Sequence, residues 1–239
     1  MPARRLSATF VTGTDTGVGK TLVASAIVAW LRSRGRSVGV YKPVETGCRR
    51  VGEELAGEDV DKLLAAGGSG QQRATASSYL FELPAAPLVA AEAAGQRIDP
   101  DRLAADLDQV ARRFDRVVVE GAGGLLVPIA DGYTYLDLAK RLDLSVLVVV
   151  GSQLGCINHA LLTLGTLEAA GVSVHGYIVN TLTAESAAGS TAAENRRAIG
   201  RFTKANDLGV FPFITEGERG DPNRLAALAH EHLDLTSLL

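Results

Sequence analysis

Short runs of apolar residues recur along the chain, each ending in glycine or a polar residue, and helix-like stretches lie between them. Residues 21–35 are one such stretch and predict a helix that Gly35 would end. Runs that are apolar on both faces are typical of parallel strands covered by helices on both sides. The alternation therefore predicts an α/β fold, doubly wound, with a mostly parallel sheet flanked by helices. The predicted strands are residues 8–12, 37–43, 116–124, 144–152 and 174–180.

Two polar stretches interrupt this alternation without dividing the chain. The composition of residues 65–72 predicts a loop, and that of residues 184–197 predicts a polar excursion. Neither stretch is long enough to separate two domains, and no internal repeat or low-complexity tract is present. At 239 residues the chain is long enough to bury a sizeable core. We therefore expect residues 1–239 to form a single domain.

Polar residues or glycines stand at the ends of four predicted strands. In an open parallel sheet the carboxyl ends of the strands share one edge, and ligands bind in the crevice there. Four separate segments are therefore predicted to converge on one cleft, together with the glycine-rich loop that follows the first strand. The residues at these strand ends are Lys42, Glu120, Gly151 and Asn180.

Composition and charge narrow the possible classes of function. Hydrophobic residues make up 46% and charged residues 21%, which is ordinary for a soluble globular protein. The net charge of −3 gives no reason to expect nucleic acid, since its partners usually present a basic face. No apolar run reaches the roughly 18 residues of a membrane span. Only a strand-length apolar segment follows the arginines of residues 1–10, which makes a poor signal peptide, so the sequence predicts a cytoplasmic protein. Cys48 and Cys156 are too few for a disulfide scaffold and lack the companions of a zinc site.

Residues 13–21, with the sequence GTDTGVGKT, have the composition of a loop that binds nucleotide phosphates. The loop follows a predicted strand and opens a predicted helix, and this is the context that the motif requires. The alternative is a glycine-rich turn that binds no ligand, and such a turn would not need this context. The backbone N–H groups of the loop and the helix dipole favour an anion. Lys20 is predicted to reach the β- and γ-phosphates, and the Thr21 hydroxyl to bind Mg²⁺. The spacing departs from the usual motif because the expected first glycine is Thr14.

Carboxylates near this loop can complete a Mg²⁺ shell. Glu120 ends a buried apolar run and is a candidate ligand, since Mg²⁺ usually takes one or two carboxylates together with substrate oxygens. A second carboxylate can come from Asp59 or Asp61 in the acidic stretch 57–64. The residues alone also allow plainer roles, with Glu120 capping the next turn and residues 57–64 forming a solvated helix start.

The segment VYKPVETG, residues 40–47, offers a cation beside the phosphate loop. Lys42 stands at a strand end fixed by Pro43, where its ammonium can lie over a reacting anion. The alternative from the residues alone is a solvated surface lysine. Thr46 and Gly47 can offer hydrogen bonds to a small ligand.

Residues 151–164 predict a loop that leads into a helix. Because a helix N-terminus has free N–H groups, residues 155–158 can hold a carboxylate. His159 falls in the first turn of this helix, where a lone histidine is more often structural than catalytic.

Together these segments resemble dethiobiotin synthetase, an ATP-dependent carboxylase of biotin biosynthesis. The resemblance runs from about residue 7 to residue 180, and residues 208–226 fit it more loosely. The GCINH segment following EGAGG is far more specific than the phosphate loop, which many unrelated NTPases share. The matching motifs are VTGTDTGVGKT (11–21), YKPVETG (41–47), VEGAGGLLVP (119–128), LGCINHALLT (154–163) and GYIVN (176–180).

The resemblance implies a fold of the P-loop NTPase type and a ligase that uses ATP and Mg²⁺. Members of this family convert 7,8-diaminononanoate, CO₂ and MgATP to dethiobiotin, ADP and phosphate. One amine takes up CO₂ to form a carbamate, whose oxygen attacks the γ-phosphate to give a carbamic–phosphoric anhydride. The second amine then closes the cyclic urea ring and expels phosphate.

The resemblance also implies roles for residues on the nucleotide side of the site. Lys42, Lys20 and Thr16 are the expected catalytic residues, with Lys42 serving the carbamate and the phosphate. Asn180 is expected to contact the adenine, although this residue alone does not separate ATP from CTP or GTP. The full set expected to bind ATP is Gly17, Val18, Gly19, Lys20, Thr21, Leu22, Asp59, Glu120, Gly121, Ala122, Gly123, Asn180, Thr181 and Pro212.

On the metal side, the resemblance implies Mg²⁺ at Thr21, Asp59 and Glu120. In the family the metal-binding acidic residue is followed by a helix. Asp59 is preferred to Asp61 because DVDKL (59–63) fits this pattern better when its first aspartate is the ligand. Thr46 is expected to contact the diamine. The family is a homodimer in which the start of the GCINH helix binds the substrate carboxylate across the subunit interface. That role falls here to Gly155, Cys156, Ile157 and Asn158.

Three other functions fit the residues less well. A partition-type regulatory P-loop ATPase would carry a second lysine where this loop has Asp15, and it gives the GCINH segment no role. An amide-forming relative of cobyrinate diamide synthase would need a glutaminase domain, for which the chain has no room. An inactive scaffold would tend to lose at least one of the phosphate-loop or strand-end residues, all of which are present.

Overall fold

The computed structural model describes residues 7–68, 70–184 and 191–239, and a six-stranded sheet forms its centre. The strands are β1 (Ala8–Gly13), β2 (Val38–Tyr41), β7 (Arg116–Gly124), β10 (Ser145–Gly151), β11 (Val174–Asn180) and β12 (Asp207–Phe211). Their order across the sheet is β2, β7, β1, β10, β11, β12, and every neighbouring pair is parallel. The direction of winding reverses at β1, so a ligand crevice is expected at the carboxyl end of this central strand.

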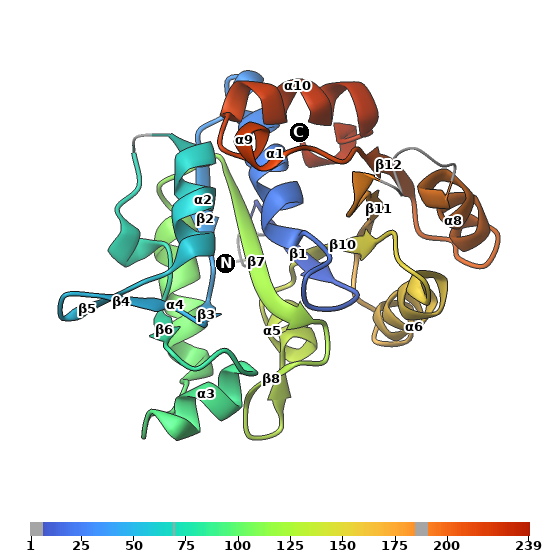
Figure 1. The fold of residues 1–239 in the computed structure, drawn as a ribbon. Helices are drawn as coiled ribbons and strands as arrows, with labels where there is room; N and C mark the ends of the chain where they lie inside the picture. Colours follow the sequence, from blue (N-terminus) through green and yellow to red (C-terminus); the bar gives the residue numbers. More distant parts are fainter. Residues whose placement is uncertain (1–6, 69, 185–190) are drawn as a thin grey trace, which may run out of the picture.

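Helices cover both faces of the sheet (Figure 1). One face is covered by α1 (Lys20–Ser33), α2 (Glu58–Gly67) and α10 (Pro222–His232). The opposite face is covered by α3 (Pro87–Ala93), α4 (Pro100–Ala111), α5 (Tyr135–Arg141), α6 (Cys156–Ala169) and α8 (Thr191–Gly200). The predicted doubly wound α/β fold is therefore confirmed.

Short elements lie around this framework. β3 (Val44–Thr46) pairs in parallel with β6 (Tyr79–Phe81), and β4 (Arg49–Val51) forms a hairpin with β5 (Glu54–Ala56) that projects from the left of the molecule in Figure 1. β8 (Pro128–Ala130) forms a second hairpin with β9 (Tyr133–Thr134), and α9 (Glu216–Arg219) is a single helical turn. The described chain also contains 3₁₀ turns at Arg73–Thr75 and Thr236–Leu238.

The strands of the central sheet face two separate apolar cores. In β10, the side chains of Val146, Val148 and Val150 join the core beneath α4, α5 and α6, whereas Leu147 and Val149 join the core beneath α1 and α10. Because side chains alternate between the faces of a strand, burial on both sides requires apolar residues at every position. This is why the central strands form unbroken apolar runs in the sequence.

Two parts of the C-terminal third differ from the sequence-based prediction. The pattern does not predict β12, which is short, lies at the sheet edge and begins with exposed Asp207. The predicted polar excursion is wrong for residues 191–197, which belong to α8, while residues 185–190 lie outside the described ranges. Only Ala192 and Ile199 of α8 are buried, so its apolar stripe is too sparse to reveal a helix.

Two further boundaries also differ. Residues 65–67 finish helix α2 and are not part of a loop. Glu120 lies inside β7, because this strand continues to Gly124 after an irregularity in its pairing with β1. β2, however, stops at Tyr41, opposite Val119 of β7. Glu120 is therefore the first residue of β7 beyond the end of β2, and its carboxylate still reaches the predicted edge of the sheet.

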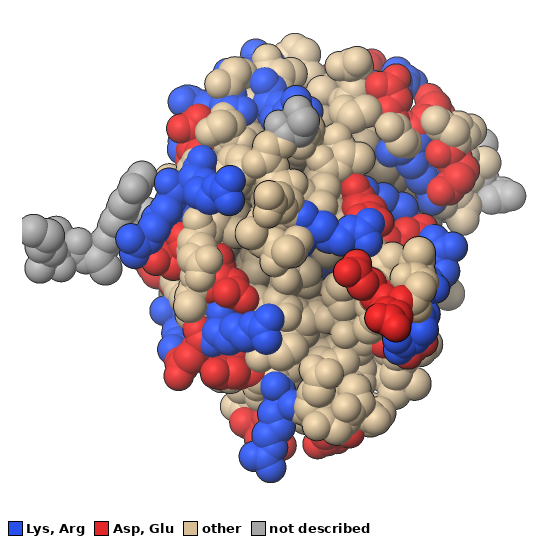
Figure 2. Space-filling model, turned by 90° about the vertical axis from the view of Figure 1, so that its left-hand side faces the viewer, with Lys and Arg blue, Asp and Glu red and all other residues tan. Residues whose placement is uncertain are grey.

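Charged side chains are interspersed over the surface. Figure 2 shows Lys and Arg side chains beside Asp and Glu side chains, with uncharged surface between them. Ion pairs such as Arg50–Glu82 (2.7 Å) and Lys62–Glu58 (2.9 Å) account for part of this mixture. The face in Figure 2 therefore lacks the continuous basic surface that nucleic-acid binding favours. In the described ranges, no helix has both the length and the apolar character needed to cross a bilayer.

The packing around Phe10 gives a test of the core. This side chain is fully buried in β1, stacks on Tyr135 with ring centroids 5.8 Å apart and lies against Gly121. Phe10→Ala should lower the free energy of unfolding by about 3–5 kcal/mol, because it leaves a cavity in a closely packed interior. The control Phe202→Ala removes a side chain that is 71% exposed and should change the free energy of unfolding by less than about 0.5 kcal/mol. Denaturant unfolding measures both, and equal losses would contradict this account of the core.

Candidate active site

The phosphate loop connects β1 to α1 and is shaped by glycines. Gly17 and Gly19 have φ values of 77° and 85°, a region that side chains other than glycine rarely adopt. Gly19 is the N-cap of α1 and provides no side-chain hydrogen bond to the helix. The first turn of α1 thus has no side-chain cap from Gly19 and lines the pocket, and a helix start of this kind can bind an anion.

Asn180, at the end of β11, supports this loop from behind. Its Nδ2 donates a hydrogen bond to the backbone oxygen of Val18 (2.9 Å), and its side chain lies against Gly19. A Cβ on Gly19 would lie only 2.1 Å from Nδ2, so this position has no room for a side chain. The Asn180 Oδ1 atom is buried and has no hydrogen-bond partner among the described residues, which leaves one acceptor available.

Lys20 folds back over the loop. Its Nζ donates a hydrogen bond to the backbone oxygen of Asp15 (2.8 Å), and the side chain is buried. Burial lowers the pKa of Lys20 to about 8, although Glu120 opposes this change. An anion bound in the loop would therefore favour the charged form of this lysine.

The segment that carries Lys42 is held by its neighbours. The backbone N–H of Lys42 donates to the oxygen of Ala76 (2.8 Å). The hydroxyl of Tyr41 shares a hydrogen bond with Ser78 Oγ (2.5 Å) and donates to the oxygen of Leu103 (3.1 Å). These contacts fix the end of β2 and so direct the next side chain, Lys42, into the pocket.

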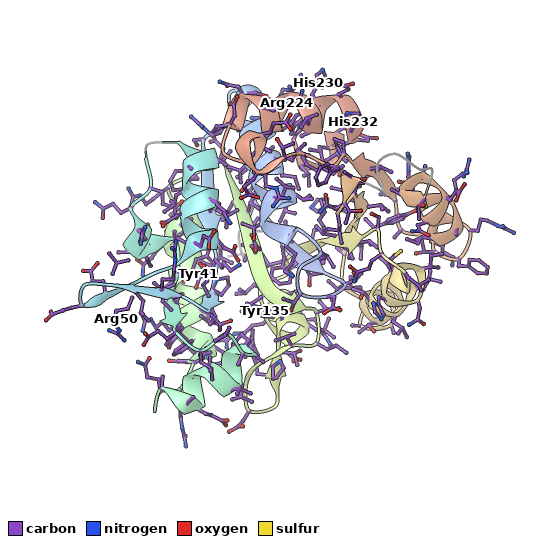
Figure 3. All side chains as sticks on the ribbon, in the orientation of Figure 1. Tyr41, Arg50, Tyr135, Arg224, His230 and His232 are labelled. Carbon is purple, nitrogen blue, oxygen red and sulfur yellow. The ribbon has the colours of Figure 1, made fainter. Side chains whose placement is uncertain are left out.

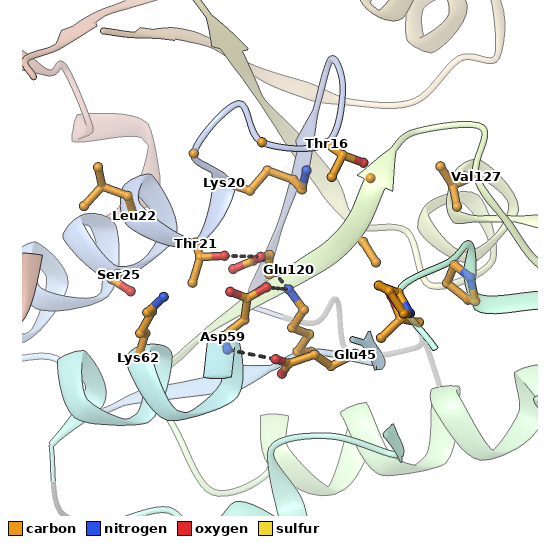
Figure 4. A pocket seen from close by; sticks show the side chains of 18 of the residues that line it. Thr16, Lys20, Thr21, Leu22, Ser25, Glu45, Asp59, Lys62, Glu120 and Val127 are labelled. Carbon is orange, nitrogen blue, oxygen red and sulfur yellow. Dashed lines mark hydrogen bonds and ion pairs between the residues drawn. The ribbon is translucent and has the colours of Figure 1, made fainter. Parts of the chain in front are cut away.

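Lys42 lies between two carboxylates from different elements (Figure 4). Its Nζ donates to Glu120 Oε1 of β7 (2.7 Å) and to Asp59 Oδ2 of α2 (2.5 Å). Thr21, in the first turn of α1, donates its hydroxyl to the same Glu120 Oε1 (2.8 Å). The end of β2, the neighbouring part of β7 and the starts of α1 and α2 therefore meet at one polar cluster, at the sheet edge that the strand order predicts.

The charges in this cluster stabilise one another. Burial lowers the pKa of Lys42, but the carboxylates of Glu120 and Asp59 outweigh this effect, and the net direction is upward. Burial raises the pKa of Asp59, but Lys42 outweighs this effect, and the net direction is downward. Lys42 and Asp59 are thus held in their charged forms at neutral pH.

The same cluster suits a magnesium ion. Glu120 Oε2 is buried without a hydrogen-bond partner among the described residues, so one carboxylate oxygen is free to bind a cation. The Thr21 hydroxyl lies 2.8 Å from the other oxygen of this carboxylate, Oε1, and Asp59 Oδ2 bonds the same Lys42 ammonium as Oε1. Asp61 pairs with Arg73 and does not line the pocket. The described ranges contain no group of three or more His, Cys, Asp and Glu residues that could hold a metal.

A pocket of about 770 Å³ surrounds this cluster. It brings together most of the predicted catalytic, nucleotide and diamine residues: Thr16, Gly17, Gly19, Lys20, Thr21, Leu22, Lys42, Thr46, Asp59, Glu120, Ala122 and Gly123. It does not include Val18, Gly121, Asn180, Thr181, Pro212 or residues 155–158. Of these, Gly121 packs on Phe10, where a Cβ would lie 2.8 Å from the ring, so its observed contact is with the core.

The start of α6 lies away from this pocket. Gly155 is the N-cap of α6, has a φ of 92° and gives no side-chain cap. Gly155 and Asn158 are exposed, Ile157 is half-buried and Cys156 is buried. Figure 1 shows α6 on the opposite side of the molecule from α2 and α3, which border the pocket. The predicted carboxylate site therefore does not line the pocket within one chain.

Several residues of the pocket are not predicted from the sequence. Glu45 accepts hydrogen bonds from the backbone N–H groups of Asp59 (2.8 Å) and Val60 (3.0 Å). Burial raises the pKa of Glu45, against the opposing effect of Lys42. Glu45 belongs to a motif that the sequence singles out, but its partners are backbone groups, which leave no pattern. The other unpredicted lining residues are Ser25, Lys62, Pro84, Ala85, Ala86, Pro87, Val127, Glu216, Arg219 and Gly220.

The histidines that the structure places lie outside the pocket. His230 and His232 are on α10 (Figure 3), His159 is on α6 and His175 is on β11. None of them lines the pocket, and none belongs to a metal-binding group of the described residues.

Comparison with known proteins identifies similar chains. A family model described as an AAA domain matches residues 7–219. An ATP-dependent dethiobiotin synthetase of Aromatoleum aromaticum is 40% identical over 218 residues, covering 91% of this chain and 94% of the relative. Proteins of the same name are 37% identical in Ralstonia nicotianae, covering 96% of each chain, and 35% identical in Escherichia coli, covering 87% and 91%.

Among solved structures, the similarity extends to other P-loop ATPases. The MinC:MinD cell division protein complex of Aquifex aeolicus aligns with a TM-score of 0.55 and 18% identity, covering 94% of each chain. A ParA family ATPase from Chlorobium tepidum aligns with a TM-score of 0.53 and 15% identity, covering 93% of this chain and 96% of the other. Identities this low show the P-loop fold alone and do not favour a partition ATPase.

The two loop glycines give a test of the nucleotide site. Gly19→Ala strains the backbone and also drives a Cβ into Asn180, whereas Gly17→Ala strains the backbone in open space. We expect Gly19→Ala to weaken MgADP binding at least roughly tenfold more than Gly17→Ala does, since only the former displaces the Asn180 hydrogen bond. Titration calorimetry measures both affinities. Equal losses would show that the contact with Asn180 does not support the loop.

Proposed function

The chain belongs to the dethiobiotin synthetase family, and we propose that it catalyses the ATP-dependent carboxylation and ring closure of 7,8-diaminononanoate with CO₂ to dethiobiotin, releasing ADP and phosphate. The observation that carries the proposal is the pocket in which Lys20 of the phosphate loop and Lys42 face a common space. Two buried cations in one pocket suit a reaction between two anions.

The charge problem of the reaction explains the need for both lysines. A carbamate and a triphosphate repel one another, and water would screen this repulsion poorly in a partly closed pocket. Lys20 would neutralise the β- and γ-phosphates, and Lys42 would lie over the carbamate and the transferring phosphoryl group. Thr16, on the pocket wall, is proposed to hydrogen-bond the phosphates.

The proposed sequence of steps requires no dedicated acid–base pair. One amine of the substrate adds to CO₂ and gives a carbamate, and a carbamate oxygen then attacks the γ-phosphorus in line, with ADP leaving. The second amine attacks the carbonyl of the resulting carbamic–phosphoric anhydride, closing the urea ring with loss of phosphate. Phosphorylation thereby turns a poor leaving oxygen into a good one, and positioning with charge neutralisation supplies most of the catalysis.

Thr21, Asp59 and Glu120 are proposed to hold Mg²⁺. The support is the unpartnered Glu120 Oε2, with the Thr21 hydroxyl and Asp59 Oδ2 in the same cluster. The ion would supply positive charge at the β- and γ-phosphate oxygens. Because Lys42 occupies the facing oxygens of Glu120 and Asp59, it would orient both carboxylates for this role.

The adenine is proposed to lie beside the ends of β11 and β12. Asn180 Oδ1 is a free acceptor that could receive the amino group of adenine. The backbone N–H of Thr181 donates to the oxygen of Phe211, so Thr181 and Pro212, the residues that follow the adjacent strands β11 and β12, lie next to Asn180. Gly17, Val18, Gly19 and Leu22 of the loop and α1, with residues 121–123 in the last part of β7, complete the proposed ATP-binding set.

The diamine is proposed to lie between Thr46 and a second subunit. Residues 155–158 do not line the pocket within one chain, so a carboxylate that they bind would reach a pocket supplied by a partner molecule. We therefore propose a homodimer in which the start of α6 from one subunit completes the substrate site of the other. The proposal also includes a cytoplasmic location, where ATP is available, and a single domain, since one sheet supports both cores.

The proposed role of Lys42 gives the first test. Lys42→Ala should leave ATP affinity, measured without metal in the presence of EDTA, within roughly threefold of wild type but lower diamine-dependent turnover about 100-fold or more, since it removes charge stabilisation of the transferring group. The control Lys62→Ala removes an exposed cation from the same pocket and should cost less than about tenfold. Initial rates of ADP release and calorimetry of ATP binding, on samples of matched folded content, separate the two effects. Unchanged turnover in Lys42→Ala would remove this lysine from the mechanism.

The proposed carboxylate site gives the second test. Gly155→Val should raise the KM for the diamine roughly tenfold or more, since it blocks the helix start, and should leave ATP affinity unchanged. Gly171→Val is the matched control, because Gly171 follows the other end of α6 with a φ of 69° and open space around it. Steady-state kinetics and ATP titration report the two effects. If only ATP affinity falls in Gly155→Val, the carboxylate site lies elsewhere.

A further inference from the structure

Glu45 holds the start of α2 from outside the helix. Its side chain is 4% exposed and lies in β3, fourteen residues before Asp59. Its two oxygens each accept one backbone N–H, Oε1 from Asp59 at 2.8 Å and Oε2 from Val60 at 3.0 Å. The Glu45 carboxylate therefore acts as the side-chain N-cap of α2, because it accepts hydrogen bonds from the first N–H groups of the helix, while the N-cap position itself is Gly57.

Gly57, on the helix side of this contact, also fits the Glu45 carboxylate. Gly57 provides no side-chain cap, and a Cβ at this position would lie 2.4 Å from Glu45 Oε2. The backbone of Gly57 has φ −87° and ψ 115°, which any residue can adopt, so glycine is required here for space and not for conformation. The helix start is thus shaped to accept the Glu45 carboxylate.

Stability of α2 alone does not explain this arrangement. A serine or aspartate at position 57 would cap the helix locally, as Asp99 does for α4 through its bond to the N–H of Asp101 (2.8 Å). Glu45 instead buries a carboxylate beside a second acidic residue, Asp59, which is electrostatically unfavourable. What the local cap would not provide is a fixed distance between α2 and the segment that carries Lys42.

That segment holds Asp59 at two points. Glu45 accepts a hydrogen bond from the backbone N–H of Asp59, and Lys42, three residues before Glu45, donates one to Asp59 Oδ2 (2.5 Å). The ten residues between Thr46 and Gly57 include the projecting β4–β5 hairpin, so chain connectivity by itself constrains Asp59 little. The geometry points to Glu45 as a positioning residue that fixes Asp59 for divalent metal binding and so sets the affinity of the site for Mg²⁺.

This inference rests on the proposed function only in taking Asp59 as a metal ligand. Its test uses Mn²⁺ as the probe, with ATP present and the diamine absent, and counts free Mn²⁺ by electron paramagnetic resonance. Glu45→Ala should raise the Mn²⁺ concentration for half-saturation about 10- to 100-fold, the usual effect of losing a group that orients a metal ligand. ATP affinity without metal, in the presence of EDTA, should stay within roughly threefold of wild type.

Matched variants separate positioning from helix stability. Gly57→Ala should reproduce the Mn²⁺ defect because it displaces the Glu45 carboxylate without altering it, and Glu45→Gln, which keeps one acceptor, should give an intermediate value. Asp99→Ala loses a comparable helix cap far from the pocket and should leave Mn²⁺ binding unchanged. If Glu45→Ala does not fold, Gly57→Ala decides the question.

The inference is overturned if Glu45→Ala and Gly57→Ala shift Mn²⁺ binding no more than Asp99→Ala does. A failure of the proposed function would appear separately, as wild-type protein that binds Mn²⁺ and ATP but forms no dethiobiotin from the diamine. In that case the Mn²⁺ comparison among the variants still decides the role of Glu45.

Discussion

A buried positive charge at the end of β2 is the constraint on which the site depends. Lys42 is only 3% exposed, and a buried ammonium without compensation would cost several kcal/mol. Glu120 from β7 and Asp59 from α2 provide that compensation, and Thr21 of α1 bonds the same Glu120. Two strands and two helices must therefore meet at one point, which is also where the phosphate loop opens.

The same compensation suits the proposed chemistry. The pocket is lined by two cations, Lys20 and Lys42, and by two carboxylates, Glu120 and Asp59, of which both bond Lys42. A polyanion that enters together with a dication would disturb this balance less than the polyanion alone. Glu45 belongs to the same scheme, because it fixes the backbone of the helix that carries Asp59.

Much of this site is predictable from the sequence, for a topological reason. Lys42 and Glu120 belong to separate strands, but the carboxyl ends of parallel strands share one edge, so their meeting follows from the strand pattern. The choice of Asp59 over Asp61 requires the family resemblance, since one turn of a helix presents both. Glu45 could not be predicted, because its partners are backbone N–H groups of a distant helix start. The sequence pattern does not predict strand β12 or helix α8, because short edge strands and sparsely buried helices carry little apolar pattern.

The central claim is that the phosphate loop and the Lys42 cluster serve carboxylation of a diamine. The most direct measurement is ADP release by the purified protein with MgATP and bicarbonate, with and without 7,8-diaminononanoate, together with mass spectrometry of the product. The account predicts that ADP release depends on the diamine and that dethiobiotin forms in equal amount. ADP release that is independent of the diamine, or the absence of dethiobiotin from a folded sample that binds ATP, would contradict it.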